Sequence, residues 1–567
     1  MRGLRLLALT ALGLLLVGCA GLPTSGPPMP GLAIGEESPE DPFVLYAQGP
    51  RPGDGPEDIV KGFLEASISP AGNWETAQEF LTEEFRKVWK PGAGVTVDDS
   101  VTDREFDPSV DADDESASEA EVQARFDQVA GVDGDGRYSA FSSTATATYQ
   151  LRRTAEGEWR ISKANDGIVL DAETFQQVYQ KYALKYFDPG WTHLVPDVRW
   201  FPRRQAMATT IARALITGAP SDWLAPAVRS AFSADLSLTG DAVTVDPTSQ
   251  AASVALPRAA LSLSATDLSR MRTQLEQSLV GVGVSEVRFT VDGTALAAAT
   301  VPVEQPIVDP GVLVLDEETF GRTVSGDVVE PVAGLTGQLA KITDPVGAVD
   351  VSLDAALAAV QLRDGRVLAV SPGEFVELDS RADLIKPSLD PFGFTWTVPR
   401  TAPAALEAWS EHGDRHPIED AWQGAESISC LRVSADGARV AAVVTTGGQH
   451  RLVVAAVVRD EDSVPAKLGE VHEIGRIDGP AQGLAWVGAD TLAVLSTGPD
   501  PALTSYVVGG PVAGSPALPE AAVALSGAKT PTGVRVLASD GAVYAQRGSS
   551  WQVALQDVLL LGTRAGY

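Results

Sequence analysis

The spacing of apolar residues changes along the chain, and each change predicts a different kind of element. After Pro56, apolar residues recur at helical spacing, and a second stretch of this kind covers residues 74–88. Residues 138–151 switch to alternation of apolar and polar positions, which predicts a strand, and the alternation returns at residues 158–162. Helices followed by an antiparallel sheet predict an α+β cone over residues 56–190.

Aromatic residues are concentrated between residues 171 and 202. Five side chains fall on one face of a predicted helix that Asp171 would cap: Phe175, Val178, Tyr179, Tyr182 and Tyr186. Beyond that helix, Trp191, Trp200 and Phe201 lie among prolines, and we expect them to pack between domains. An aromatic platform for a sugar chain is the alternative interpretation of these three residues.

Residues 203–300 mix two periods, which predicts an α/β domain. Apolar stripes at helical spacing cover residues 207–215 and 268–279. Short strand patterns separate and follow these helices, at residues 243–245, 252–256 and 285–293.

From Pro306 to the end, helical signals give way to short strands with Gly or Asp turns. A Ser-x-Asp turn recurs at Ser352, Ser388 and Ser434, at offsets of 36 and 46 residues, and an apolar strand follows each turn. Such offsets match one four-stranded blade each, so residues 306–567 are predicted to form an all-β propeller of five or six blades. The turn hydroxyls and carboxylates are expected to accept hydrogen bonds from turn amides, which is a structural role.

Two of the predicted domains resemble known ones. The helices and sheet of residues 56–190, with the closing strand Trp159-Arg160-Ile161, resemble the ketosteroid-isomerase-like (SnoaL-like) superfamily. The order of helices and strands in residues 203–300, ending in a Val-Asp-Gly turn at residues 291–293, resembles the GerMN domain of spore-germination lipoproteins. The fold predicted for the whole chain is therefore multidomain: a SnoaL-like cone, a GerMN-like domain and a propeller.

The N-terminus carries a lipidation signal. Arg2 and Arg5 precede an apolar run that is too short to span a bilayer and that ends in Leu16-Val17-Gly18-Cys19. We expect residues 1–18 to be a signal peptide and Cys19 to be acylated, since two or three acyl chains anchor stably. Residues 19–55 hold eight of the nine prolines found between residues 22 and 56, a composition that favours an extended tether.

Charge and cysteine content exclude several functions. The chain has 75 acidic and 43 basic residues, a net charge of -32, which disfavours binding to nucleic acid or to anionic lipid by the protein body. Apart from Cys19 the only cysteine is Cys430, so the mature chain is expected to have no intramolecular disulfide. Cys430 lies in an apolar strand pattern, where a buried, unreactive thiol is expected.

Catalytic and metal-binding motifs are not found in the sequence. His412 and His416 have the spacing of a zinc pair, but Gly413 stands where a catalytic glutamate belongs. The acidic segment 98–121 and the turn Asp133–Arg137 lack the full ligand pattern of a calcium loop, so a solvated loop is the favoured interpretation of the acidic segment. We therefore expect no enzyme activity, no cofactor and no metal site. A propeller hydrolase whose metal ligands are scattered along the chain is a remaining alternative.

The order of the lipidation signal, proline-rich tether, cone, GerMN-like domain and propeller resembles the LpqB family of actinobacterial lipoproteins. The segments that carry the resemblance are residues 16–19, the VDGTALA segment at 291–297 and blade segments such as residues 431–437. This resemblance implies an accessory lipoprotein that associates with the extracellular domain of the sensor kinase MtrB. Such a protein modulates the MtrAB two-component system, which controls cell-wall homeostasis and cell division.

The predicted location follows from the acylated Cys19: the cell membrane, lipid-anchored, on its extracytoplasmic face. The partners expected are MtrB and, through the lipid, the membrane, with no nucleic acid. A lipoprotein that binds cell-wall glycan is the alternative function.

Overall fold

The computed structural model describes residues 47–567 apart from 112, 113, 115, 204, 205, 234, 235, 240–242, 305–310, 324–327, 461, 498–500, 515, 516, 519, 520 and 549. These residues belong to one compact unit, Leu45–Tyr567. The predicted signal peptide, Cys19 and the tether as far as residue 46 lie outside the described residues.

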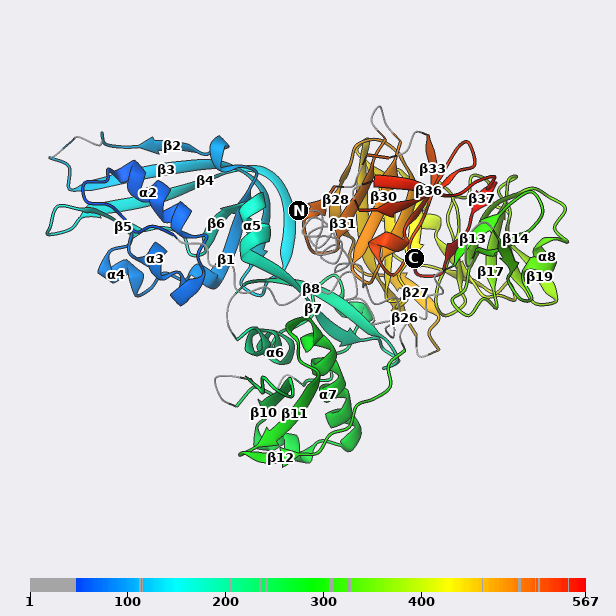
Figure 1. Ribbon diagram of the computed structural model, residues 1–567, viewed down its shortest axis with the longest axis horizontal. Helices are drawn as coiled ribbons and strands as arrows, with labels where there is room; N and C mark the ends of the chain where they lie inside the picture. The colour runs from blue at the N-terminus through cyan, green and yellow to red at the C-terminus, as the bar shows by residue number, and fades with distance from the viewer. Residues whose placement is uncertain are drawn as a thin grey trace, which may run out of the picture. The chain divides into compact units, whose positions relative to one another are not determined.

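The N-terminal region packs short helices against a six-stranded sheet (Figure 1). Helix α2 (Pro56–Ala66) begins with proline at its first position, where the missing amide hydrogen costs no hydrogen bond, and it buries Ile59, Val60, Phe63 and Leu64 as the spacing predicts. The sheet has the order β5-β4-β3-β1-β6, with β2 paired to β3. Its strands are β1 (Gly94–Asp98), β2 (Glu105–Pro108), β3 (Glu119–Asp133), β4 (Tyr138–Arg153), β5 (Trp159–Lys163) and β6 (Ile168–Asp171).

The second predicted helix, over residues 74–88, is wrong in its length. The segment forms two single turns, α3 (Glu75–Gln78) and α4 (Glu83–Arg86), and between them Leu81 makes a β-bridge to Ile161. Val88, the last residue of the apolar stripe that predicts this helix, is exposed. The acidic segment 98–121 is also more regular than the predicted loop, since β2 and the start of β3 lie within it.

The long aromatic helix predicted after Asp171 is only partly confirmed. Asp171 caps α5 (Ala172–Val178) by accepting hydrogen bonds from the amides of Glu173 and Thr174. From Tyr179 onward the chain is a strand instead. Strands β7 (Tyr179–Phe187) and β8 (Leu194–Pro202) form an antiparallel hairpin whose inner side chains, Tyr182 and Tyr186 among them, enter the core of the next region.

That next region contains helix α6 (Met207–Thr217), helix α7 (Ala265–Leu279) and a sheet of order β12-β11-β10-β9. The strands are β9 (Thr244–Val245), β10 (Ala251–Ala255), β11 (Glu286–Val291) and β12 (Thr294–Leu296). Strands β10 and β11 are parallel, and α7 is the crossover between them. Gly218 follows α6, and Ser264 caps α7 by accepting the amide hydrogen of Asp267.

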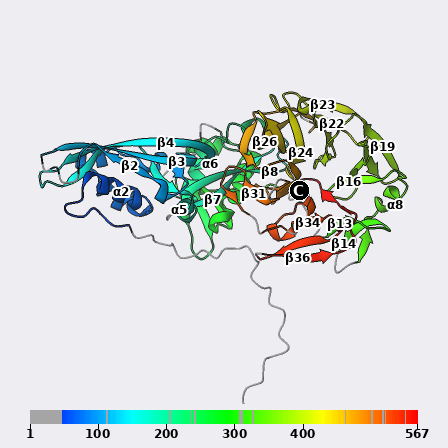
Figure 2. The same cartoon turned by 90° about the horizontal axis from the view of Figure 1, so that it is seen from above.

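The C-terminal half forms six sheets of four or five strands in the described residues, arranged in a ring (Figure 2). In chain order they contain β13 (Val312–Leu315), β14 (Phe320–Thr323) and β15 (Val329–Pro331); β16 (Val346–Val351), β17 (Ala358–Leu362), β18 (Val367–Ser371) and β19 (Glu374–Asp379); β20 (Ser388–Leu389), β21 (Thr395–Thr397), β22 (Glu407–Trp409) and β23 (Arg415–Pro417); β24 (Ser427–Val433), β25 (Arg439–Thr446), β26 (Gln449–Arg459), β27 (Pro465–Leu468) and β28 (His472–Ile477); β29 (Ala481–Val487), β30 (Thr491–Ser496), β31 (Leu503–Val507) and β32 (Val512–Ala513); β33 (Ala522–Ser526), β34 (Arg535–Ala538), β35 (Val543–Arg547) and β36 (Ser550–Leu555). One short helix, α8 (Thr336–Leu339), interrupts the strands, where the sequence predicts none.

The ring is closed by the C-terminal end of the chain. Strand β37 (Leu560–Leu561) pairs antiparallel with β13 and completes the first sheet, and β38 (Thr563–Arg564) pairs parallel with β16 of the second. The first sheet therefore contains strands from both ends of the propeller, and their hydrogen bonds hold the ring closed.

Two of the three Ser-x-Asp turns have the structural role that the sequence predicts, whereas the Ser388 hydroxyl accepts the amide hydrogen of Val433 on the neighbouring sheet. The Ser434 hydroxyl donates to Asp436, which accepts the amide hydrogen of Ala438. The same pattern links Ser352, Asp354 and Ala356. These side chains hold the turns between the first and second strands of their sheets.

Candidate functional site

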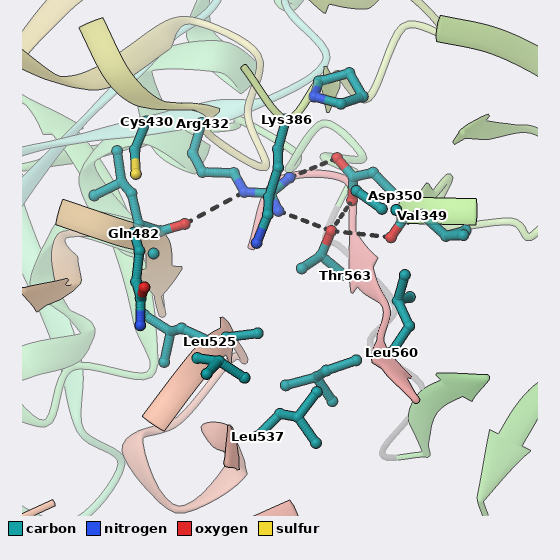
Figure 3. A pocket seen from close by; sticks show the side chains of 18 of the residues that line it. Val349, Asp350, Lys386, Cys430, Arg432, Gln482, Leu525, Leu537, Leu560 and Thr563 are labelled. Atoms are coloured by element: carbon teal, nitrogen blue, oxygen red, sulfur yellow. Dashed lines mark hydrogen bonds and ion pairs between the residues drawn. The ribbon is translucent and has the colours of Figure 1, made fainter. Parts of the chain in front are cut away.

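A cavity of about 440 Å³ opens on the axis of the propeller, where the innermost strands of several sheets begin. Residues from β16, β24, β29, β33 and β37 line it, together with the segments before β20 and after β17 and β21. Volumes of this order are typical of small-molecule sites. Figure 3 shows its polar side chains on one side and leucines on the other.

A buried network of three side chains forms part of the wall. The Arg432 guanidinium, on β24, pairs with Asp350 of β16 at 2.7 Å and donates to the Thr563 hydroxyl at 2.8 Å. Thr563 in turn donates to the second Asp350 oxygen at 2.8 Å. The first Asp350 oxygen also accepts the amide hydrogen of Leu389, at 2.8 Å. Every charge in this network is therefore satisfied by protein, and the network ties three sheets and the C-terminal strand together.

The Lys386 ammonium differs from Arg432 because, among the described residues, no hydrogen bond or ion pair reaches it. Its side chain projects into the open cavity, so it is accessible to solvent while protein atoms surround it (Figure 3). Burial lowers the pKa of Lys386. The neighbouring Cys430 thiol, on β24, is only partly buried where the sequence predicts a buried thiol, and burial raises its pKa.

Two further arginines come from the turns that follow the second strands of neighbouring sheets. Arg363 follows β17 and is exposed, and no described residue pairs with its guanidinium. Arg400 follows β21 and lies 3.6 Å from Asp383, a half-exposed pair at the protein surface. The cavity is therefore lined by four cations and by one carboxylate, Asp350, which Arg432 already neutralises.

Most of the remaining wall is apolar and belongs to the fifth and sixth sheets and to β37 of the first sheet. Its large side chains are Leu484, Val523, Leu525, Leu537, Leu559, Leu560 and Leu561. Two of these side chains leave apolar surface exposed: Leu559 is 58% exposed and Val523 38%. The site can therefore contact an apolar group as well as a charged one.

Apart from Cys430 and the start of the blade segment 431–437, the residues that sequence patterns single out lie outside the cavity. Cys19 is outside the described residues. Trp200 and Phe201 are buried, as expected of packing residues, which excludes them as an exposed sugar platform. Trp191 stacks under the Arg270 guanidinium, 4.1 Å from the ring centre.

The sequence motifs that resemble metal sites form ordinary turns and strands. His412 lies on a hairpin turn and His416 on β23, so they do not share a helix face. In the Asp133–Arg137 turn, Arg137 pairs with both Asp133 and Asp135. Among the described residues, no group of three or more His, Cys, Asp or Glu side chains is placed to hold a metal ion.

Of the cavity residues, the sequence patterns single out Cys430 as a structural thiol, and Leu431 and Arg432 only as part of a blade segment. The only signal was local: Lys386-Pro387 and Arg432 adjoin the Ser-x-Asp turns at Ser388 and Ser434, and this position beside the innermost strand repeats from sheet to sheet. Nothing in the sequence indicates that these cations line one cavity, because the residues around that cavity are far apart along the chain.

Three family profiles match consecutive parts of the chain. "Lipoprotein LpqB, N-terminal domain" matches residues 49–176, "Germane: Sporulation and spore germination" matches 183–297, and "Lipoprotein LpqB beta-propeller domain" matches 318–558. The GerMN-like domain and the propeller predicted from the sequence are thereby confirmed. Within the described residues, no helix has both the length and the apolarity that crossing a membrane requires.

Curated relatives match along most of the chain. The Lipoprotein LpqB of Thermobifida fusca is 29% identical, with 88% of each chain covered, and that of Cutibacterium acnes is 25% identical over 100% of both. A chain of the solved nidogen/laminin complex aligns with 10% identity and a TM-score of 0.33, covering 45% of this chain and 97% of its own length, a similarity too slight to use. The family profiles and these relatives agree with the order of domains described above, and the chain belongs to the LpqB family of lipoproteins.

Proposed function

We propose that this protein is a lipid-anchored lipoprotein on the extracytoplasmic face of the cell membrane that associates with the extracellular domain of the sensor kinase MtrB. In this role it modulates the MtrAB two-component system, which controls cell-wall homeostasis and cell division. It acts by binding and not by catalysis. The observation that carries the proposal is the match to LpqB lipoproteins over nearly the whole chain.

Anchoring makes weak association effective. A protein held at the membrane by acyl chains on Cys19 meets another membrane protein at high effective concentration, so a modest interface suffices. The net charge of -32 supports an attachment through lipid, because the protein body repels anionic headgroups.

The finer fold assignments form part of the same proposal. We assign the N-terminal region to the SnoaL-like cones, on the basis of α2 packed against a curved, mostly antiparallel sheet. We assign six blades to the propeller, one for each sheet of the ring.

Crosslinking in intact cells tests the association. The wild-type chain is expected to yield a crosslinked product that contains MtrB, and Cys19→Ala, which cannot be acylated, is expected to lose both that product and the effect on signalling while it remains folded. The control is Lys467→Gln, which removes one exposed charge on β27 and leaves the anchor in place. Normal signalling by a released Cys19→Ala protein would contradict the role of the anchor.

A second experiment separates this function from glycan binding. If the chain acts through MtrB, insoluble peptidoglycan should not retain the purified protein. Saturable retention on peptidoglycan, together with no MtrB crosslink, would contradict the kinase proposal and favour the glycan-binding alternative.

A further inference from the structure

We propose that the axial cavity of the propeller binds a small anionic amphiphile, a molecule with a phosphate or carboxylate head and an apolar tail. The head would lie beside Lys386, Arg363 and Arg400, and the tail against the leucines of the fifth and sixth sheets and of β37. This site goes beyond association with a kinase and does not depend on it.

The charge of the cavity wall is opposite in sign to the charge of the whole chain. The chain as a whole has 75 acidic residues against 43 basic ones, yet the cavity is lined by four basic residues and one acidic residue. A concave surface lined by one sign of charge concentrates ligands of the opposite sign. A cationic hollow in a strongly anionic protein therefore selects anions locally, whereas the rest of the surface repels them.

Only some of the cations that line the cavity are paired with other protein groups in the described residues. Arg432 is occupied by Asp350 and Thr563, so it shapes the wall and is not available to a ligand. In contrast, no described residue pairs with Lys386 or with the Arg363 guanidinium, and Arg400 has only a surface partner at 3.6 Å. A cation surrounded by protein atoms and left without a counter-ion gains most from an anionic ligand.

The apolar wall indicates the rest of the ligand. Leu525, Leu537 and Leu560 face the cavity on the side opposite Lys386 (Figure 3). Leu559 and Val523 leave apolar surface exposed at the same cavity, and covering that surface with an alkyl chain is favourable. An inorganic anion would satisfy only the cations, and a neutral lipid would satisfy only the leucines, so the two walls together specify an amphiphile.

Calorimetric titration tests the proposal on the full chain carrying Cys19→Ser, in which no attached acyl group competes. The probes are octyl phosphate and octanoate, kept below micelle-forming concentration; octyl glucoside and inorganic phosphate are the uncharged and tail-free controls. We expect saturable binding of one molecule of octyl phosphate, octanoate or both, and at least tenfold weaker binding of each control. The relative affinity for the two probes identifies the head group.

Three variants locate the site. Lys386→Gln is expected to weaken binding about tenfold, the loss typical of one charge-assisted hydrogen bond. Leu559→Ser, an exposed position that folding does not require, is expected to weaken octyl phosphate more than inorganic phosphate. Lys467→Gln on β27 removes the same charge outside the cavity and should change nothing.

Other outcomes would overturn the proposal. Unchanged affinity in a folded Lys386→Gln variant would exclude the cavity as the site. Equal binding of octyl glucoside would exclude a role for charge, and equal binding of inorganic phosphate would exclude a role for the apolar wall. Failure of both octyl probes to bind would exclude the site altogether, and it would leave the MtrB crosslink unaffected, so the two proposals fail separately.

Discussion

At the scale of single residues, the propeller depends on a few buried polar side chains that connect distant strands. Arg432 and Asp350 are 82 residues apart in sequence, and Arg432 and Thr563 are 131 apart, yet they form one hydrogen-bonded network. The side chains of Arg432 and Asp350 are only 9% and 2% exposed, so removing one of them leaves the other poorly solvated. Replacing only one member of this buried ion pair should therefore lower the stability of the protein strongly, because the other charge is left without a partner.

We predict that Arg432→Met lowers the free energy of unfolding by about 3–5 kcal/mol, because it leaves the buried Asp350 carboxylate unpaired. The measurement is chemical denaturation of the purified chain. Arg258→Met is the matched control: Arg258 pairs with Asp292 at 2.6 Å, but both side chains are largely exposed, so a loss of at most about 1 kcal/mol is expected. Equal losses in the two variants would contradict the structural role of the buried network.

The sequence predicts local polar contacts and not distant ones. The hydrogen bonds of a Ser-x-Asp turn can be predicted from the sequence, because Ser434, Asp436 and Ala438 lie within a few residues of each other and turn geometry fixes their contacts. The hydrogen bonds of Arg432 cannot be predicted in this way, and neither can the lack of a described partner for Lys386. Both depend on which sheets become neighbours in the ring. The cavity could therefore not be predicted, because the sequence contains the residues that line it but does not show that they lie together.

At the scale of elements, the largest errors arise where aromatic spacing fits two periods. Phe175, Tyr179, Tyr182 and Tyr186 satisfy a helical pattern, but Tyr182, Leu184 and Tyr186 also alternate, and the hairpin with β8 selects the strand. Asp171 starts the helix correctly, because capping is a local interaction, whereas the end of the helix is set by a strand pair formed in the tertiary fold. Most of the helices and strands predicted for residues 203–300 are found, since their periods are unambiguous.

Closure of the ring by β37 gives the second prediction. Leu561 is 6% exposed and lies opposite Val314 in the pair of β37 with β13, so Leu561→Ala should lower the free energy of unfolding by about 2–5 kcal/mol by opening a cavity. Leu559, two residues earlier and 58% exposed, is the matched control, and Leu559→Ala should change stability by no more than about 0.5 kcal/mol. Thermal unfolding of both variants checks the difference, and similar midpoints would contradict a closing role for β37.

At the scale of the whole described unit, contacts join the Germane region to the propeller. The Lys181 ammonium on β7 pairs with Asp490 at 3.0 Å, and the Trp200 indole donates to the Gly509 carbonyl at 2.8 Å. The Trp223 ring stacks on the His472 ring with 5.6 Å between ring centres and 8° between planes. Two propeller residues, Ala438 and Ala456, belong to the same apolar core as helices α6 and α7. The sequence predicted aromatic packing between domains at Trp200 but not the histidine that faces Trp223.

Because His472 takes part in this junction, stability should depend on pH there. Burial lowers the pKa of His472 below its ordinary value of 6.5, although nearby Glu470 opposes the shift. The unfolded chain therefore binds a proton at a higher pH than the folded chain does, so the free energy of unfolding should fall as the pH drops from about 7 through 6.5 toward the lower, folded-state pKa. His472→Phe keeps an aromatic ring against Trp223 but cannot be protonated. Denaturant unfolding of both proteins from pH 7.5 to pH 5 should show a shallower decline for the variant and similar values at pH 7.5, where the native histidine is neutral in both states. A variant that loses stability as steeply as the native chain would show that protonation of His472 does not weaken the junction.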